Sequence, residues 1–370
     1  MGKNAQEEAL HAAAGQETLL RERDELKIHC FRLSAELEDS TRSNVALKEY
    51  LKTAETQREA LRMERDELKE HLSRLAAELD EAHAVAAKPS LLFVEAGHFY
   101  SPVVDPASPF VRQALQEAER TMMAQTAIPA VALDDQTMHA VFSNLMRWYA
   151  EMPFPVEKAE GLRYYFENPA FSYTDAFVLY GMIRTLRPKR IVEIGCGYST
   201  CVIFDTVDRF VEPRPEITCF DPYPDVPYAL TAPDDPLRQA IQATPLQQIP
   251  GQIFSSLEAG DILFIDSSHI AKTGSDVLDY MFRALPLVKP GVYIHIHDIA
   301  YPFEYSKEWA VSENRSWNEG YLLRAFLMYN EAFEIVFWND YYVRKFTSRV
   351  MEQAPLCLKN GGGSMWLLRR

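Results

Sequence analysis

The sequence predicts an α/β domain at its C-terminal end, preceded by a long parallel coiled coil, and two observations carry this prediction. After about residue 170, short apolar segments alternate with amphipathic ones, which is the pattern of a parallel β-sheet covered by helices on both faces. Before residue 88, leucines recur every seventh residue in a stretch without proline. The predicted domains are a coiled coil at 1–88, a helical prelude at 89–160 and the α/β domain at 161–370.

The coiled coil is predicted from one apolar seam. A second series of residues lies four positions after each leucine of the seam, and it includes Asn44, which favours two parallel strands. The segment 22–27 recurs at 64–69, an offset of six heptads that keeps the seam in register. We expect a homodimer. A single amphipathic helix folded back on the globular domain is the alternative. The leucines of the seam are Leu19, Leu26, Leu33, Leu47, Leu61, Leu68 and Leu75.

Residues 89–160 contain several prolines and two amphipathic stretches. Pro102, Pro106 and Pro109 indicate an extended, turn-rich segment. Helices are predicted at 108–124 and 135–150, packing on the domain that follows. Within that domain we expect helices at 175–186, 199–209, 236–242, 275–285 and 321–329, and strands at 190–194, 217–220, 262–265, 292–296, 333–338 and 365–369. Ligands bind such sheets outside the carboxyl ends of the strands.

The first strand runs into a glycine loop that predicts an adenosine-containing cofactor. Gly195 and Gly197 allow a tight turn beside a ligand, and Asp221 ends the next strand, where a carboxylate can accept both ribose hydroxyls. Thr200 stands where a nicotinamide fingerprint needs a third glycine. Glu193 suits a cofactor with an ammonium group, so S-adenosylmethionine is predicted. The predicted cofactor-binding residues are Asn168, Tyr173, Glu193, Gly195, Cys196, Gly197, Ser199, Asp221 and Asp266.

Two further strands end in polar residues that predict catalysis. Asp266 and His269 follow one strand, and His297 and Asp298 follow the next, so all four should meet at the rim that holds the glycine loop. Methyl transfer to oxygen requires a hydroxyl that is deprotonated or polarised. His269 or His297 could be the general base. Alternatively, Asp266, His297 and Asp298 could bind Mg²⁺ or another divalent cation. His295 is interpreted as a structural strand residue.

The composition restricts partners and location. A formal charge of −15 argues against nucleic acid or an anionic membrane as the main partner. The five cysteines lack C-x-x-C spacing, which suits a reducing cytoplasm. We see no apolar signal-peptide core and no transmembrane stretch. A cytoplasmic protein is therefore expected, held at the inner membrane only through partners.

The chain from about residue 97 resembles a bacterial class I S-adenosylmethionine-dependent methyltransferase family, whose members typically occur among enzymes of surface-polysaccharide and other glycan assembly. The resemblance implies a seven-stranded Rossmann-like sheet and methyl transfer. By looser similarity to catechol-type O-methyltransferases, Asp266 corresponds to a metal-binding aspartate, and His297 and Asp298 to an Asp-Asn pair. His297 departs from that pattern. The matching segments are 97–102, 163–165, 193–200, 265–269, 295–299, 317–321 and 362–367.

These observations predict an O-methyltransferase that acts on a sugar hydroxyl of a glycan or glycolipid. Trp309 and Trp317, in an irregular stretch after the last metal candidate, are suited to stacking on sugar rings. The coiled coil would dimerise the enzyme or dock it to a polysaccharide-synthesis complex. The alternatives are methylation of a small phenolic or other metabolite, and a coiled-coil scaffold whose domain binds the cofactor without catalysis. A nicotinamide oxidoreductase fits least.

Overall fold

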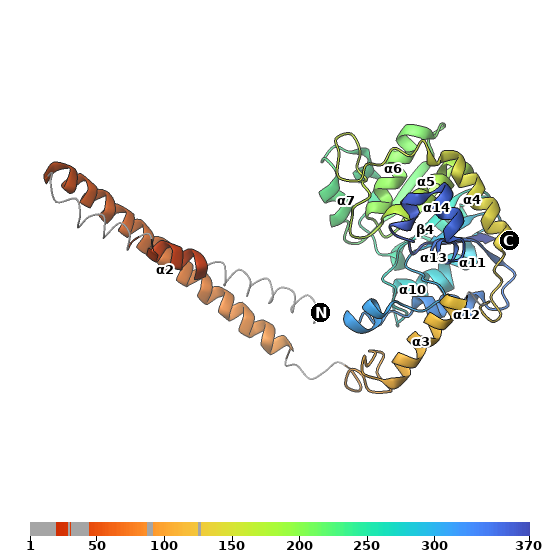
Figure 1. The fold of residues 1–370 in the computed structure, drawn as a ribbon, viewed down its shortest axis with the longest axis horizontal. Helices are drawn as coiled ribbons and strands as arrows, with labels where there is room; N and C mark the ends of the chain where they lie inside the picture. Colours follow the sequence, from red (N-terminus) through yellow and green to blue (C-terminus); the bar gives the residue numbers. More distant parts are fainter. Residues whose placement is uncertain (1–19, 29, 31–43, 87–91, 125–126) are drawn as a thin grey trace. The chain divides into compact units, whose positions relative to one another are not determined.

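The computed structural model describes residues 20–28, 30, 44–86, 92–124 and 127–370 (Figure 1). The chain divides into two compact units, residues 1–95 and residues 96–370. Among the described helices, none combines the length and the apolar character needed to cross a bilayer.

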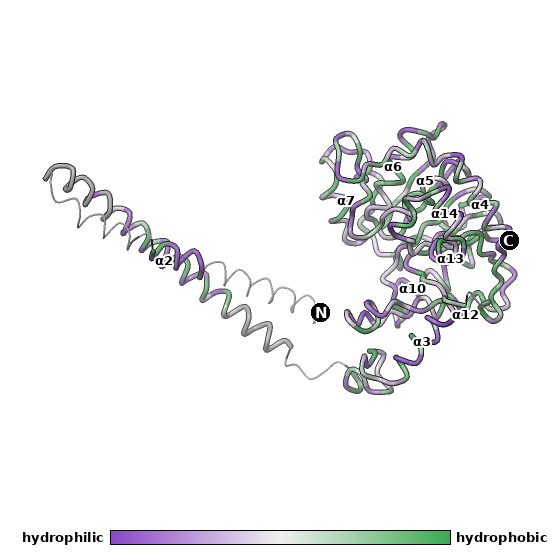
Figure 2. Tube along the Cα trace, in the orientation of Figure 1, coloured by the Kyte–Doolittle hydropathy of each residue, from purple (hydrophilic) through white to green (hydrophobic). Residues whose placement is uncertain are grey.

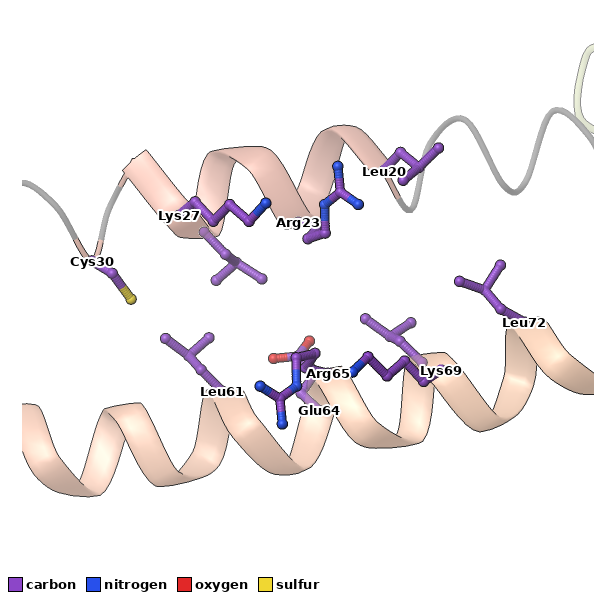
Figure 3. Close-up of a pocket in the computed structure, with 11 residues that line it drawn as sticks. Leu20, Arg23, Lys27, Cys30, Leu61, Glu64, Arg65, Lys69 and Leu72 are labelled. Carbon is purple, nitrogen blue, oxygen red and sulfur yellow. The ribbon is translucent and has the colours of Figure 1, made fainter.

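The first unit contains two helical segments that lie against each other. Helix α2 spans Asn44–Ala86, and hydrophobic and hydrophilic residues alternate along its described turns (Figure 2). The helix at residues 20–28 runs beside it in the opposite direction, so that Leu20 lies near Leu72 and Cys30 near Leu61 (Figure 3). These side chains line a groove of about 470 Å³. The structure thus shows heptad residues paired within one chain, and the parallel two-stranded coiled coil stays a prediction. Leu19 and Leu33 lie outside the described residues.

The two predicted helices of the prelude are present as α3 (Pro109–Ala124) and α4 (Asp135–Tyr149). Helix α4 begins after Asp134, whose carboxylate accepts a hydrogen bond from the Gln136 amide at 2.9 Å and so satisfies one free N–H of the first turn. Its buried residues Met138, Phe142 and Leu145 face α5 and β6. Both helices lie in the second unit, which begins at Ala96. The predicted domain bounds at 88 and 160 stay a prediction.

The core of the second unit is a seven-stranded sheet, the strand number that the family resemblance implied. Its strands, in the order β3-β2-β1-β4-β5-β7-β6, are mostly buried apolar segments. Their bounds are β1 Arg190–Ile194, β2 Glu216–Phe220, β3 Ile241–Gln242, β4 Ile262–Ile265, β5 Tyr293–Ile296, β6 Phe333–Trp338 and β7 Met365–Arg369.

Two features of the sheet differ from the prediction. The sheet is mixed rather than parallel, because β7 inserts between β5 and β6 and runs antiparallel to both. A buried apolar strand has the same pattern in either direction, so the sequence did not reveal this. The predicted helix at 236–242 ends early as α8 (Pro236–Ala240), and the next two residues form β3 at the sheet edge.

Helices cover both faces of this sheet (Figure 1). Helices α5 (Tyr173–Leu186) and α6 (Tyr198–Phe210) contact each other and, with α4, group on one side. On the other side lie α10 (Asp276–Asp279), a π-helical turn (Tyr280–Ala284), α11 (Leu285–Leu287) and α12 (Glu319–Leu327). The remaining helices are α7 Asp225–Leu230, α9 Gly251–Ser255, α13 Asn339–Lys345 and α14 Thr347–Gln353, with π-helical Glu308–Ser312 and 3₁₀ turns Leu246–Gln248 and Pro355–Leu358.

The strand register sets the position of the site. Ile194 of β1 is paired with Phe220 of β2 and with Ile265 of β4, and Ile265 is paired with Ile296 of β5. The residues that follow these strands therefore leave the sheet at the same rim. Asp266 donates its amide to Ile194 at 2.8 Å, and His297 donates its amide to Ile265 at 3.0 Å. The predicted convergence of the strand ends is confirmed.

Candidate active site

The glycine turn after β1 requires glycine at one position and leaves space at the other. Gly195 has a φ of +81°, and a Cβ there would lie 2.0 Å from the carbonyl oxygen of Asp266. Gly197 has an extended backbone, and a Cβ there would have no atom within 4 Å, so the turn faces open space. Thr200, which replaces the third glycine of a nicotinamide fingerprint, accepts the Gly197 amide at 2.9 Å with its hydroxyl. This residue therefore fixes the turn at the start of α6.

Glu193 is fully buried beneath this turn. One carboxylate oxygen accepts the hydroxyl of Ser199 at 2.7 Å, whereas the other, Oε2, has no hydrogen-bond partner among the described residues. Burial raises the pKa of Glu193 to about 7, although the hydrogen bond from Ser199 opposes the rise. A buried carboxylate with an unused oxygen fits a cationic ligand group, such as the ammonium of S-adenosylmethionine.

Asp221 ties the end of β2 to the same turn. Its Oδ2 accepts the Cys196 amide at 2.8 Å, and its Oδ1 accepts the Tyr223 amide at 2.7 Å. Each carboxylate oxygen has two lone pairs, so both retain capacity for a ribose hydroxyl. The carboxylate is thus positioned by the loop that would hold the rest of the cofactor.

Asn168 and Tyr173, also predicted to contact the cofactor, have partners of their own. The Asn168 amide group donates to the carbonyls of Tyr165 and Phe171 at 2.7 and 3.0 Å and accepts the Phe171 amide at 2.7 Å. Tyr173 is buried, stacks on Phe166 with ring centroids 5.0 Å apart, and donates its hydroxyl to Glu167. Both side chains shape the segment before α5, and their contact with a cofactor stays a prediction.

His269 is held by a buried carboxylate that the sequence analysis gave no catalytic role. Its Nδ1 donates to Glu319 Oε2 at 2.8 Å, and both residues are buried. Glu319 begins α12 and also accepts the hydroxyls of Ser267 and Tyr280 at 2.7 and 2.6 Å. The imidazole is therefore fixed, with Nδ1 protonated and Nε2 directed elsewhere. In the sequence, the one indication of this role is that Glu319 is an acidic residue in the Trp317–Gly320 stretch. It lies 50 residues from His269, so the sequence does not show the pairing.

The free nitrogen of His269 faces the two predicted catalytic aspartates. Its Nε2 lies 3.5 Å from Asp266 Oδ1 and 3.6 Å from Asp298 Oδ2. Burial disfavours the imidazolium, but the hydrogen bond and charge of Glu319 and the charges of both aspartates outweigh it and raise the pKa of His269 to about 9. Burial also raises the pKa of Asp266. The site therefore combines one imidazole with two carboxylates at the ends of β4 and β5 and a third, Glu319, at the start of α12.

His297 lies next to this group, and His295 lies behind it in the sheet. His297 Nε2 is 3.6 Å from Asp298 Oδ1, and no described residue forms a hydrogen bond with its Nδ1. Burial disfavours the charged form of His297, but Asp298 and Asp266 favour it, and its pKa is raised. His295 bonds Ser364 Oγ at 2.8 Å and stacks on Phe264. Burial lowers the pKa of His295 well below its usual value, which agrees with a structural role.

The predicted metal ligands do not form a compact cluster. Within the described part of the chain, three His, Cys, Asp or Glu ligand atoms lie within 4.8 Å of one another only at Glu193, Cys196 and Cys219. Asp266, His297 and Asp298 are not such a group, so their arrangement does not fit a preformed metal site. Their metal role stays a prediction, and we assign no step to a metal.

Aromatic side chains form a wall beside His269. Trp317 lies over the imidazole with centroids 4.3 Å apart, and Tyr305 and Trp309 contact Trp317 at 6.0 and 5.1 Å. Arg315 lies over both tryptophans at 4.4 and 4.5 Å. This wall, formed by Tyr305, Trp309, Arg315 and Trp317, comes from the irregular stretch between β5 and α12.

A family model described as a methyltransferase domain matches residues 192–299. This segment of the chain is a methyltransferase domain. The match covers the end of β1, the glycine turn, β4, β5 and all four predicted catalytic residues, from Asp266 to Asp298. It confirms the predicted enzyme class and agrees with S-adenosylmethionine as the methyl donor of this domain.

Individual relatives of the methyltransferase domain are distant. An uncharacterized protein of Archaeoglobus fulgidus is 29% identical over 135 residues, which are 35% of this chain and 58% of the relative. The chain thus spans less than two thirds of that curated relative. Among solved structures, an O-methyltransferase from Bacillus cereus in complex with SAH is 14% identical, covering 70% of this chain and 100% of its own, with a TM-score of 0.32. The O-methyltransferase TomG from Streptomyces achromogenes is 12% identical, covering 69% and 98%, with a TM-score of 0.31. Similarity at this level carries no argument about the acceptor.

Proposed function

We propose that this chain is an S-adenosylmethionine-dependent O-methyltransferase that methylates a sugar hydroxyl of a glycan or glycolipid. The observation that carries the proposal is the convergence of three strand ends at one rim within a methyltransferase domain. The end of β1 supplies a glycine turn over a buried carboxylate. The ends of β4 and β5 supply Asp266, His269 and Asp298, which are the groups needed to activate a hydroxyl.

The residues around the glycine turn would hold the methyl donor. Glu193 offers its unpartnered oxygen to the ammonium group, and Asp221 retains lone pairs for the ribose hydroxyls. S-adenosylmethionine supplies a methyl group on a sulfonium, which an acceptor oxygen attacks in line. The open space at Gly197 leaves room for this cofactor beside Asp266.

His269 is the candidate general base. Because Glu319 keeps Nδ1 protonated, loss of the other proton leaves an Nε2 lone pair directed to the space between Asp266 and Asp298. A hydroxyl bound there would transfer its proton to Nε2. Asp266 and Asp298 then stabilise the resulting imidazolium, as Glu319 does from the other side. A cationic cofactor nearby would lower the pKa of His269 toward neutrality.

A charged cleft that shares Tyr305 with the aromatic wall favours a sugar over a planar phenol. A cleft of about 690 Å³ lies between α3 and the segment after β5, and it is lined by charged side chains of both signs, including Arg112, Glu304, Asp340 and Arg344. A sugar presents many hydroxyls that such groups can bind, whereas a phenol requires a mainly apolar slot. The aromatic wall adds flat surfaces beside His269.

Two measurements test this function. Calorimetry of the full chain with S-adenosylmethionine should show binding and calorimetry with NAD should not; absence of S-adenosylmethionine binding rejects the enzyme class. Transfer of a radiolabelled methyl group is then measured with glycolipids, oligosaccharides and catechols as acceptors. Labelled glycan is expected. Labelling of catechol alone would favour the small-molecule alternative, and cofactor binding without transfer to any acceptor would favour the scaffold alternative.

We further propose that the N-terminal unit joins two copies of the chain and docks them to a polysaccharide-synthesis complex. The half-buried heptad leucines Leu26, Leu61 and Leu68 retain apolar surface after pairing within one chain, which supports further association. Sedimentation of the full chain should give a dimer, and a shorter chain beginning at Lys88 should give a monomer. If both sediment as monomers, the dimer is refuted.

A further inference from the structure

Three potential metal ligands lie close together beneath the glycine turn. The proposed methyl transfer gives them no joint role. The Glu193 carboxylate and the thiols of Cys196 and Cys219 place one ligand atom each within 4.8 Å of the others. Glu193 and Cys219 are register partners on β1 and β2, and the turn at Gly195 brings Cys196 back over them. The chain's other described cysteines are not part of this group.

These ligands include a buried carboxylate that one hydrogen bond only partly satisfies. Glu193 and Cys219 are both fully buried, and within the part of the chain that the structure describes Oε2 of Glu193 has no hydrogen-bond partner. The thiols of Cys196 and Cys219 are hydrogen-bonded to each other beside this carboxylate. An unpartnered buried carboxylate oxygen beside two thiols is unfavourable, and a bound cation would compensate it.

Two sulfurs and one carboxylate oxygen are ligands for a thiophilic ion rather than for Mg²⁺. Zinc binds sulfur at about 2.3 Å and carboxylate oxygen at about 2.0–2.2 Å in tetrahedral sites, which places neighbouring ligand atoms on the order of 3.5–3.8 Å apart. In the structure the three ligand atoms lie within 4.8 Å of one another, so they would have to move closer together by about 1 Å at most to reach that spacing. Cys196 is half-buried, and the adjacent Gly197 faces open space, so an ion can enter from the cofactor side and find its fourth ligand there.

We propose that Glu193, Cys196 and Cys219 bind one Zn²⁺ ion and that the bound ion excludes S-adenosylmethionine. Binding forms two Zn–S bonds and one Zn–O bond, and it releases the two thiol protons to solvent, with a third where Glu193 is protonated. The ion occupies the Glu193 oxygen that would bind the cofactor ammonium. The exclusion rests on the proposed function, whereas the metal site itself does not. The enzyme would thus be inhibited by free zinc.

The test begins with full-length protein freed of metal by a chelator. Titration with Cd²⁺, a spectroscopic substitute for Zn²⁺, should produce a thiolate-to-metal absorption band that saturates at one ion per chain. Cys219→Ala should weaken Cd²⁺ and Zn²⁺ binding by about 100-fold or more, because only one thiolate remains. Cys357→Ala removes a different buried cysteine and should leave the band unchanged. Cys219→Ser repeats the test with a side chain of closer volume, and tryptophan fluorescence confirms that each variant is folded.

Calorimetry with S-adenosylmethionine gives the second readout. Zinc should weaken cofactor binding by the wild-type chain and have no effect on Cys219→Ala, which should bind the cofactor normally without metal. Absence of the absorption band in the wild type, its persistence in Cys219→Ala, or an unchanged cofactor isotherm with zinc would overturn the proposal. Failure of the metal-free wild type to bind S-adenosylmethionine would instead reject the proposed function, and the absorption band would still decide the metal site.

Discussion

Replacement of Glu193 by glutamine should stabilise the methyltransferase domain at alkaline pH while it weakens cofactor binding. Burial raises the pKa of Glu193 from an ordinary 4.5 to about 7. A raised carboxyl pKa means that the folded state holds the proton more tightly than the unfolded state, so its contribution to stability is full below about 4.5 and is lost as the pH rises through 7. At about 1.4 kcal/mol for each pH unit, the loss amounts to about 3 kcal/mol. Glutamine does not ionise and avoids this loss.

Urea unfolding across pH 5 to 9 measures the effect. All five tryptophans lie after residue 96, so their fluorescence reports the second unit. The free energy of unfolding of Glu193→Gln should exceed the wild-type value by up to about 3 kcal/mol at pH 8.5, and the gain should shrink as the pH falls toward 5. The amide oxygen can still accept the Ser199 hydroxyl. Glu216→Gln, at an exposed strand residue, is the control and should show no such trend. A gain that is constant with pH would refute the reasoning.

Four further variants test the rest of the site. Glu319→Gln removes a charge that helps to raise the pKa of His269 to about 9. The acid limb of the pH profile of kcat/KM should therefore move to lower pH. An acid limb that does not move would argue against His269 as the general base. Asp298→Ala should abolish methyl transfer but keep the calorimetric affinity for S-adenosylmethionine; unchanged turnover would remove this residue from the mechanism. Gly195→Ala should lower the free energy of unfolding by about 2 kcal/mol or more and abolish cofactor binding, because its Cβ would clash with Asp266. Gly197→Ala has open space and should leave the free energy of unfolding unchanged. Equal losses of stability for the two variants in urea unfolding would contradict this account of the turn.

The meeting of the catalytic candidates at one edge of the sheet could be predicted, because the ends of neighbouring parallel strands lie at the same edge. Strand β1 begins and ends where the apolar pattern does, at Arg190–Ile194, and the polar residues that follow β4 and β5 meet there. Parallel neighbours with aligned register must deliver their next residues to one edge. Asp266, His269 and Asp298 are therefore brought together by topology alone, which a single sequence already contains.

The partners of these residues could not be predicted in the same way. The contact between His269 and Glu319 joins the end of β4 to the start of α12, and it depends on how the irregular stretch between β5 and α12 returns to the sheet. The cluster of Glu193, Cys196 and Cys219 depends on facing side chains of paired strands. The two strands were predicted, but their pairing, and which of their side chains face the glycine turn, were not. Strand β7 has an apolar pattern that is the same in both directions, so its antiparallel orientation was also hidden.

The N-terminal unit shows what a heptad pattern can predict. It identifies the apolar face of a helix but not which helix packs against that face. In the structure the helix at residues 20–28 lies antiparallel to α2, with Leu20 near Leu72 (Figure 3). This places the repeat at 22–27 opposite its copy at 64–69, so the groove has nearly the same side chains on both walls. A seam with two matching copies can pair within one chain or between two chains with similar contacts. Chain concentration then decides between them, because only the pairing between chains depends on it.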